Sequence, residues 1–244
     1  MKEKIVVVLS MLALLSVSGT LWAQQVPTPD HVVVVVLENH GSSQIIGSAD
    51  APYLNSLATD TFGALFTNSH GMTHPSQPNY MYLFSGDNQN VILDFTQLSF
   101  LLPFTSANLG AELLAAGKTF TGYSEDLPSV GFTGDSTAGY YRKHAPWVNW
   151  LNSNANGIPA ALHQPFTAFP TNYNNLPTLS FVIPNENHDM HNGTIAQADA
   201  WMHANLDSYV QWAKAHNSLL IVTFDEDENL TGSNQITTFL WGKW

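Results

Sequence analysis

The chain has 244 residues, and its 7 Lys and Arg against 19 Asp and Glu give a formal net charge of −12 at pH 7. So acidic a chain lacks the positive surface with which proteins hold phosphate backbones, so we expect no nucleic-acid partner. The absence of Cys excludes disulfides, thiolate metal ligands and Cys nucleophiles. With 44% hydrophobic residues the chain can bury a substantial core, which predicts one globular domain.

The first 23 residues have the pattern of a secretory signal peptide. Two lysines precede an apolar run from Ile5 to Val17, and Ala23 supplies a small residue for cleavage. A buried N-terminal helix is the alternative, although the run has no capping residue. We therefore expect a signal peptide at 1–23 and a secreted or periplasmic domain at 24–244. We expect no transmembrane segment, because no second apolar stretch is long enough.

The remaining sequence alternates β-rich and helical segments, which predicts an α/β domain. Its first strand, His31–Leu37, is a nearly unbroken run of Val, typical of a strand covered on both faces of a parallel sheet. In chain order we then expect a helix at 51–60, a strand at 63–67, helices at 78–84 and 107–116, strands at 119–123 and 178–183, a helix at 195–215, and strands at 219–224 and 236–240. Residues 129–177 are rich in Asn, Pro, Gly and aromatic residues and predict a long excursion over the sheet, of the kind that forms lids or substrate walls.

Polar clusters follow three of the predicted strands. They are Glu38-Asn39-His40, the segment 185–191, and the segment 225–228. Any one of them alone is typical of a solvated loop. Because ligands of parallel sheets bind outside the carboxyl ends of the strands, the three clusters together predict one site.

Ser76 is the candidate nucleophile, because it directly precedes a predicted helix. The unpaired N–H groups and the positive dipole end of a helix favour both an alkoxide and a phosphate group. The alternative is a serine that only caps the helix. The pattern G-x-S-x-G is absent around Ser76, so acyl transfer by a Ser-His-Asp triad is not indicated.

Five motifs occur in the order seen in a bacterial phosphoesterase family that includes phospholipases C and acid phosphatases. The motifs are Glu38-Asn39-His40, His74 to Tyr80, Tyr141 to Trp147, Asn187 to His191, and Thr223 to Glu226. The chain resembles this family over residues 30–238, and the family looks like a branch of the alkaline phosphatase superfamily.

The resemblance implies an alkaline-phosphatase-like three-layer α/β sandwich with a mostly parallel central sheet. It also implies a hydroxyl nucleophile at Ser76. The metal ligands that it implies are Glu38, Asn39, Asp225 and Glu226. The phosphate-pocket residues that it implies are Asn79, His144 and His191.

Elementary electrostatics agrees with the implied metal. Glu38, Asp225 and Glu226 together would repel one another and any phosphate, and a divalent cation removes that conflict. Oxygen and amide ligands suit Ca²⁺, Mg²⁺, Mn²⁺ or Zn²⁺ alike. Attack by Ser76 on the metal-bound ester would give a phosphoseryl enzyme that water then hydrolyses, with Asn79 donating to a phosphate oxygen.

The histidines leave alternatives open. His144 follows Arg142 and Lys143, and this basic cluster can hold phosphate or protonate the leaving group. His191 is either a general acid or, together with His188, a ligand of a second metal ion.

The C-terminal segment departs from the family pattern. Related sequences continue past a strand like 236–240 into a glycine-rich turn and a His-containing helix, whereas this sequence ends at Trp244. We therefore expect an uncovered apolar face and low stability or self-association.

The sequence predicts an exported, metal-dependent phosphoric ester hydrolase acting on a small phosphate ester or a phospholipid. One alternative is a catalytically inactive metal- or phosphate-binding remnant of the family, as the shortened C-terminus suggests. Another is a sulfatase or phosphotransferase of the same superfamily.

Overall fold

The computed structural model describes residues 28–94, 103–230 and 232–243. The predicted signal peptide therefore lies outside the described residues. Within the described ranges, none of the helices combines the length and the apolar character needed to span a membrane.

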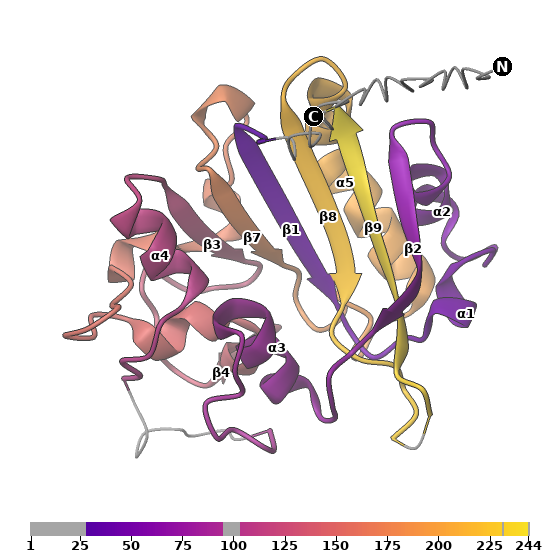
Figure 1. The fold of residues 1–244 in the computed structure, drawn as a ribbon. Helices are drawn as coiled ribbons and strands as arrows, with labels where there is room; N and C mark the ends of the chain where they lie inside the picture. The colour runs from indigo at the N-terminus through magenta and orange to yellow at the C-terminus, as the bar shows by residue number, and fades with distance from the viewer. Residues whose placement is uncertain (1–27, 95–102, 231, 244) are drawn as a thin grey trace, which may run out of the picture.

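A seven-stranded sheet forms the centre of the fold (Figure 1). In spatial order its strands are β2 (Gly63–His70), β9 (Gln235–Lys243), β8 (Ser218–Phe224), β1 (His31–Leu37), β7 (Leu179–Ile183), β3 (Phe120–Ser124) and β6 (His163–Pro165). Strand β1 pairs in parallel with β7 and β8, and β3 pairs in parallel with β6 and β7. Strand β9 runs antiparallel to both β8 and β2. The sheet is therefore mostly parallel, as predicted.

Strand β1 contributes to two separate cores. Val33 and Val35 are buried in the core on one face of the sheet, and Val34 and Val36 in the core on the other. Successive side chains of a strand point to opposite faces, so a run of Val suits a strand with a core on each side. The two cores confirm the three-layer sandwich.

Helices cover both faces of the sheet. The first core includes side chains of α1 (Ser42–Ile45), α2 (Pro52–Ala58) and α5 (Ile195–Ala213), and the second includes side chains of α3 (Ser76–Ser85) and α4 (Leu109–Ala115). Helix α5 begins with a capping box in which Thr194 and Gln197 bond to each other's backbone. It ends two residues before the predicted boundary. The short helix α1 was not predicted.

The predicted excursion at 129–177 is ordered and anchored. It contains a two-stranded sheet of β4 (Ser136–Thr137) and β5 (Tyr140–Tyr141). Its 3-10 helices are η1 (Arg142–His144), η2 (Pro146–Trp150), η3 (Ala160–Leu162), η4 (Phe166–Ala168) and η5 (Tyr173–Asn175). Trp147 and Trp150 are fully buried in the second core, and a Cβ at Gly122 of β3 would collide with the Trp147 ring. This anchoring fixes the segment that carries His144.

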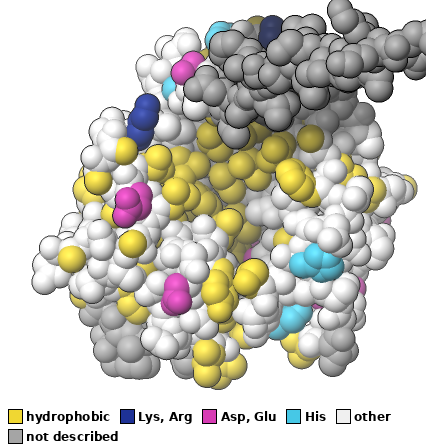
Figure 2. Space-filling view, viewed as in Figure 1, with side chains coloured by type: hydrophobic (Ala, Val, Ile, Leu, Met, Phe, Trp, Pro, Cys, Tyr) yellow, Lys and Arg dark blue, Asp and Glu magenta, His cyan; other side chains and the backbone are white. Residues whose placement is uncertain are grey.

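An apolar hollow lies over the sheet on the side of α3 and α4 (Figure 2). Its volume is about 430 Å³. The apolar side chains that line it include Val32, Val34, Leu83, Leu109, Leu113 and Ile221. Among the described residues, no helix covers this side of β8 and β9.

Candidate active site

The site lies where β1 and β8 end, beside the start of α3 (Figure 1). Glu38 and Asn39 are the first residues after β1. Asp225 and Glu226 are the first residues after β8. The backbone N–H of Asp225 donates to the carbonyl of Leu37 at 3.0 Å, which continues the ladder between the two strands. The predicted convergence of these two clusters is therefore confirmed.

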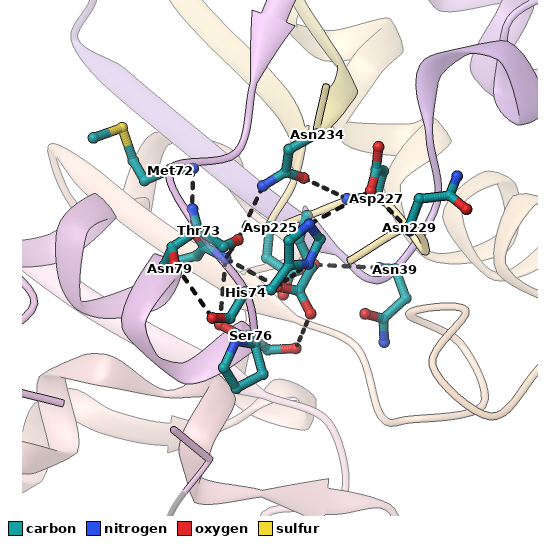
Figure 3. Close-up of polar contacts among 12 residues, drawn as sticks. Asn39, Met72, Thr73, His74, Ser76, Asn79, Asp225, Asp227, Asn229 and Asn234 are labelled. Atoms are coloured by element: carbon teal, nitrogen blue, oxygen red, sulfur yellow. Dashed lines mark hydrogen bonds and ion pairs between the residues drawn. The ribbon is translucent and has the colours of Figure 1, made fainter. Parts of the chain in front are cut away.

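Ser76 faces the carboxylates of both clusters. Its Oγ donates to Glu38 Oε2 at 3.0 Å and lies 3.2 Å from Glu226 Oε1. Ser76 is the first residue of α3, so its hydroxyl lies near the unpaired N–H groups of the first turn. The capping position belongs to Pro75, so the alternative of a capping serine is wrong. Figure 3 shows Ser76 close to His74 and Asn79.

The carboxylates of the site are buried, and burial together with their mutual repulsion raises their pKa values. Burial, reinforced by the charges of Asp225 and Asp189, raises the pKa of Glu38 well above its usual range. Burial raises the pKa of Asp225 to about 7. Burial and the charge of Asp225 raise the pKa of Glu226 to about 8. When ionised, these buried carboxylates repel one another, and a nearby cation would stabilise their charged forms.

The four predicted metal ligands lie together. The backbone N–H of Asn39 donates to Asp225 Oδ1 at 3.2 Å, and its side-chain amide donates to Glu38 Oε2 at 3.4 Å. Among the described residues, Asp225 Oδ2 is buried without a hydrogen-bond partner. Such an oxygen, next to two further carboxylates, fits a divalent cation.

Asn79 braces the turn that precedes α3 (Figure 3). Its Oδ1 accepts from the N–H groups of Met72 and Thr73, at 3.1 and 3.0 Å. Its Nδ2 donates to the carbonyl of Thr73 at 2.8 Å and to Glu226 Oε2 at 3.1 Å. Asn79 therefore orients a predicted metal ligand, and its donation to phosphate stays a prediction.

A second group of possible metal ligands shares Glu38. His144 Nε2 lies 3.2 Å from Glu38 Oε1, and His144 Nδ1 lies 3.5 Å from Asp189 Oδ2. All three side chains are buried, and one ligand atom from each lies within 4.8 Å of the others. Burial lowers the pKa of His144 well below its usual range, which keeps the ring neutral as metal binding requires. The structure thus contains a triad able to bind a divalent ion.

Three further residues belong to the site. The hydroxyl of Tyr80 donates to Glu38, and its ring stacks on His144 at a centroid distance of 5.1 Å. His74 Nδ1 lies 3.0 Å from Glu226 Oε2. The third residue is Asp189 of the possible metal triad, which the sequence analysis did not single out as a site residue. Tyr80 follows Ser76 by four residues, the spacing that places two side chains on one helix face, and this signal was available.

Some predicted residues lie at the rim or elsewhere. His191 is 29% exposed and its ring centroid lies 5.9 Å from that of His144. His188 instead pairs with Glu125 at 2.9 Å, so the possible metal triad uses His144 rather than His188. Arg142 was expected to hold phosphate with Lys143. It donates to the Thr133 carbonyl and to Asn149, so the structure gives Arg142 contacts within the excursion, and a phosphate contact of Arg142 stays a prediction.

Comparison with known proteins agrees with this geometry. The model of the Phosphoesterase family matches residues 48–230. A phosphatidylinositol-3-phosphatase from Mycobacterium tuberculosis is 48% identical over 223 residues, which cover 90% of this chain and 71% of that protein. An acid phosphatase from Aspergillus fumigatus is 30% identical over 191 residues, which cover 74% of this chain but only 42% of that protein.

Solved structures show the same fold at low sequence identity. A protein of the alkaline phosphatase superfamily from Vibrio parahaemolyticus aligns with a TM-score of 0.58 and 13% identity, over 88% of this chain and 60% of that one. The C-terminal periplasmic domain of EcEptC from Escherichia coli aligns with a TM-score of 0.54 and 12% identity, over 88% and 73%. The fold is therefore that of the alkaline phosphatase superfamily. On the family match and the 48% identity, the chain belongs to the Phosphoesterase family and is a phosphoric ester hydrolase.

Proposed function

We propose that the chain is an exported, metal-dependent phosphatase in which Ser76 is the nucleophile. The observation that carries this proposal is the hydroxyl of Ser76, which contacts two buried carboxylates at the first residue of α3. A serine that served only the fold would not need buried carboxylates with raised pKa values around it. Export is proposed from the signal-peptide pattern of the first 23 residues.

Glu38, Asn39, Asp225 and Glu226 would hold the metal ion. Their fit rests on the buried, unpaired oxygen of Asp225 and on the crowding of three carboxylates. When bound, a divalent cation neutralises phosphate charge and makes the serine hydroxyl more acidic. The triad of Glu38, His144 and Asp189 offers a place for a second ion.

Each side chain of the site has a separate part in the proposed reaction. Ser76 Oγ attacks phosphorus, the bond from phosphorus to the leaving oxygen breaks, and a phosphoserine forms. The Oγ proton passes to a carboxylate in contact with it, Glu38 or Glu226, and from there to the departing oxygen. His144, whose burial lowers its pKa and keeps the ring neutral, would hold the second ion together with Glu38 and Asp189. Water then cleaves the phosphoserine and releases inorganic phosphate. Asn79 keeps Glu226 in place throughout.

The proposed substrates are phosphate monoesters, either small or carried on a lipid headgroup. The support is that the relatives are a phosphatidylinositol-3-phosphatase and acid phosphatases. The fungal acid phosphatases are about twice as long as the part that this chain matches, so only the shared core supports the transfer.

The proposal is tested by trapping the intermediate. The protein is stripped of metal, reloaded separately with Ca²⁺, Mg²⁺, Mn²⁺ or Zn²⁺, incubated with an aryl phosphate and quenched in acid. Mass spectrometry of the digest should find phosphate on Ser76 only in metal-loaded samples, together with release of the aryl alcohol. An aryl sulfate serves as the control ester. Turnover by metal-free protein, or turnover of the phosphate without phosphate on Ser76, would overturn the mechanism.

A further inference from the structure

Lys143 brings a positive charge to the edge of the acidic site. Its Nζ lies 2.9 Å from Asp94 Oδ2 and 3.4 Å from His191 Nε2, and the side chain is only 15% exposed. Burial raises the pKa of Glu38 and of Glu226, and the charge of Lys143 offsets part of that rise. The ammonium group therefore acts on the carboxylates that surround Ser76.

Asp94 joins this ammonium group to the start of α3. One oxygen of its carboxylate accepts from Lys143, and the other accepts from the backbone N–H of Gln77 at 2.9 Å. Gln77 is the residue after Ser76. The carboxylate of Asp94 thus occupies an anion-binding position beside Ser76, between the ammonium group of Lys143 and the backbone N–H of Gln77. The side chain of Asp94 is 33% exposed, so it can turn out toward solvent when another anion arrives.

Arg142, the other cation of the motif Tyr141 to Trp147, makes its contacts within the excursion. Arg142 is committed to the Thr133 carbonyl at 2.8 Å and to Asn149 Oδ1 at 3.2 Å. Its bonds hold the excursion in shape. Of the two cations Arg142 and Lys143, Lys143 is therefore the one that faces the site.

We propose that Lys143 binds the phosphate group of the substrate in the place that Asp94 occupies here, and that it selects monoesters over diesters. A monoester dianion has one more negative charge than a diester and keeps a third charged oxygen free to accept from an ammonium group. In a diester that oxygen carries a second carbon substituent and no charge. A partly buried cation beside it therefore favours the monoester. This inference rests on the proposed function and names the substrate class of the same site.

The experiment compares kcat/KM for an aryl phosphate monoester and for the matching aryl methyl phosphate diester. Lys143→Met should lower the monoester value by about 10- to 100-fold, the usual effect of losing a charged contact, and the diester value by a few-fold at most. Lys143→Arg keeps the charge and should retain most of the preference. Lys118→Met removes an exposed lysine and is the matched control, with both values unchanged.

A second measurement needs no turnover. Binding of inorganic phosphate to the metal-loaded Ser76→Ala protein is followed by calorimetry. Adding Lys143→Met should weaken the affinity about tenfold or more, whereas adding Asp94→Asn should strengthen it, because the competing carboxylate charge is gone.

Equal losses for the monoester and the diester in Lys143→Met, or unchanged phosphate affinity, would overturn the inference and leave Lys143 a purely structural partner of Asp94. Melting temperatures of all variants identify those that fail to fold, and Lys143→Arg then decides in place of Lys143→Met. If the unmodified protein hydrolyses neither ester, the proposed function fails, and the calorimetry still tests the phosphate contact.

Discussion

The hydroxyl of Ser76 lies between Glu38 and Glu226 because α3 begins at that residue and points its first turn at the ends of β1 and β8. The helix is held by Tyr80 and Phe84, which are fully buried in the second core. A nucleophile mounted in this way keeps its orientation without help from the substrate.

Replacing Ser76 with Ala should lower kcat by about three orders of magnitude or more, because no other hydroxyl replaces a covalent nucleophile. The fold and the metal content should stay nearly intact, since the metal ligands remain. Steady-state kinetics with an aryl phosphate, together with metal analysis, checks both expectations. Ser56→Ala, in an exposed turn of α2, is the control. A rate within tenfold of the unmodified enzyme excludes the role.

Replacing Asp225 with Asn should weaken metal binding and activity together. The substitution keeps the shape but removes one of three negative charges that the cation would neutralise. Activity measured against metal concentration should show a higher half-saturating concentration, with a large part of the rate restored at excess metal. Asp50→Asn, at an exposed position, should leave the curve unchanged. An unshifted metal curve for Asp225→Asn contradicts the predicted ligand set.

At the residue scale, the order of the motifs predicted the site residues that follow the ends of β1 and β8. Glu38, Asn39, Asp225 and Glu226 meet because two parallel strands end together, which the sequence pattern already required. The partners of Lys143 were not predictable. Asp94 lies in no motif, and its contact depends on the tertiary placement of η1 beside the segment that follows α3.

At the element scale, α2 depends on a side chain from another helix. Helix α2 has no capping side chain of its own, and Asp199 of α5 accepts from the N–H groups of Tyr53 and Leu54 at 3.1 and 2.8 Å. Asp199 is buried, so its negative charge is held by the N-terminal N–H groups of α2. The carboxylate of Asp199 thus connects α5 to α2 on the same face of the sheet.

Asp199→Ala should therefore lower the free energy of unfolding by about 1–3 kcal/mol, the cost of leaving buried N–H groups without partners. Asp199→Asn should cost less, because it keeps one acceptor. Urea unfolding followed by circular dichroism measures both. Activity per folded molecule should not change, since α2 and α5 lie on the face opposite α3. A smaller loss for Ala than for Asn would contradict the capping role.

Element prediction succeeded where the pattern was long and failed where it was short. The Val run of β1 and the capped, periodic α5 were predicted nearly to the residue. Strand β6 has three residues and joins the sheet through parallel pairing with β3, so a local sequence pattern does not predict it. Helix α1 has four residues and is fixed by contacts with distant segments, including Glu228 against Gly41.

At the scale of the whole molecule, the buried acidic site couples stability to pH. The folded protein raises the pKa of Asp225 to about 7 and that of Glu226 to about 8, whereas unfolded carboxyl groups titrate near 4. The metal-free folded state therefore binds more protons than the unfolded state between these values. Its stabilisation by these groups is complete below about pH 4 and is lost as the pH rises through 7 to 8.

The melting temperature of the metal-free protein should thus decrease as the pH is raised from about 5.5 to about 8.5. A divalent cation should raise it more at pH 8.5 than at pH 5.5, because metal binding requires the deprotonated carboxylates. Differential scanning fluorimetry with and without cation measures both effects. Asp225→Asn should flatten the pH dependence. A metal-free protein that melts higher at pH 8.5 would contradict the burial of these charges.

The placement of the site residues after strand ends has an evolutionary consequence. Glu38 and Asn39 follow β1, which is packed on both faces, and Asp225 and Glu226 follow β8, whose Leu220, Val222 and Phe224 are buried in the first core. These packing residues take no part in the chemistry. Substitutions at exposed positions of the neighbouring turn, such as Asn229 and Leu230, can thus be tested for a changed leaving-group preference without disturbing the buried residues of the fold. Libraries restricted to these positions should remain largely folded, and new ester preferences can be selected from them.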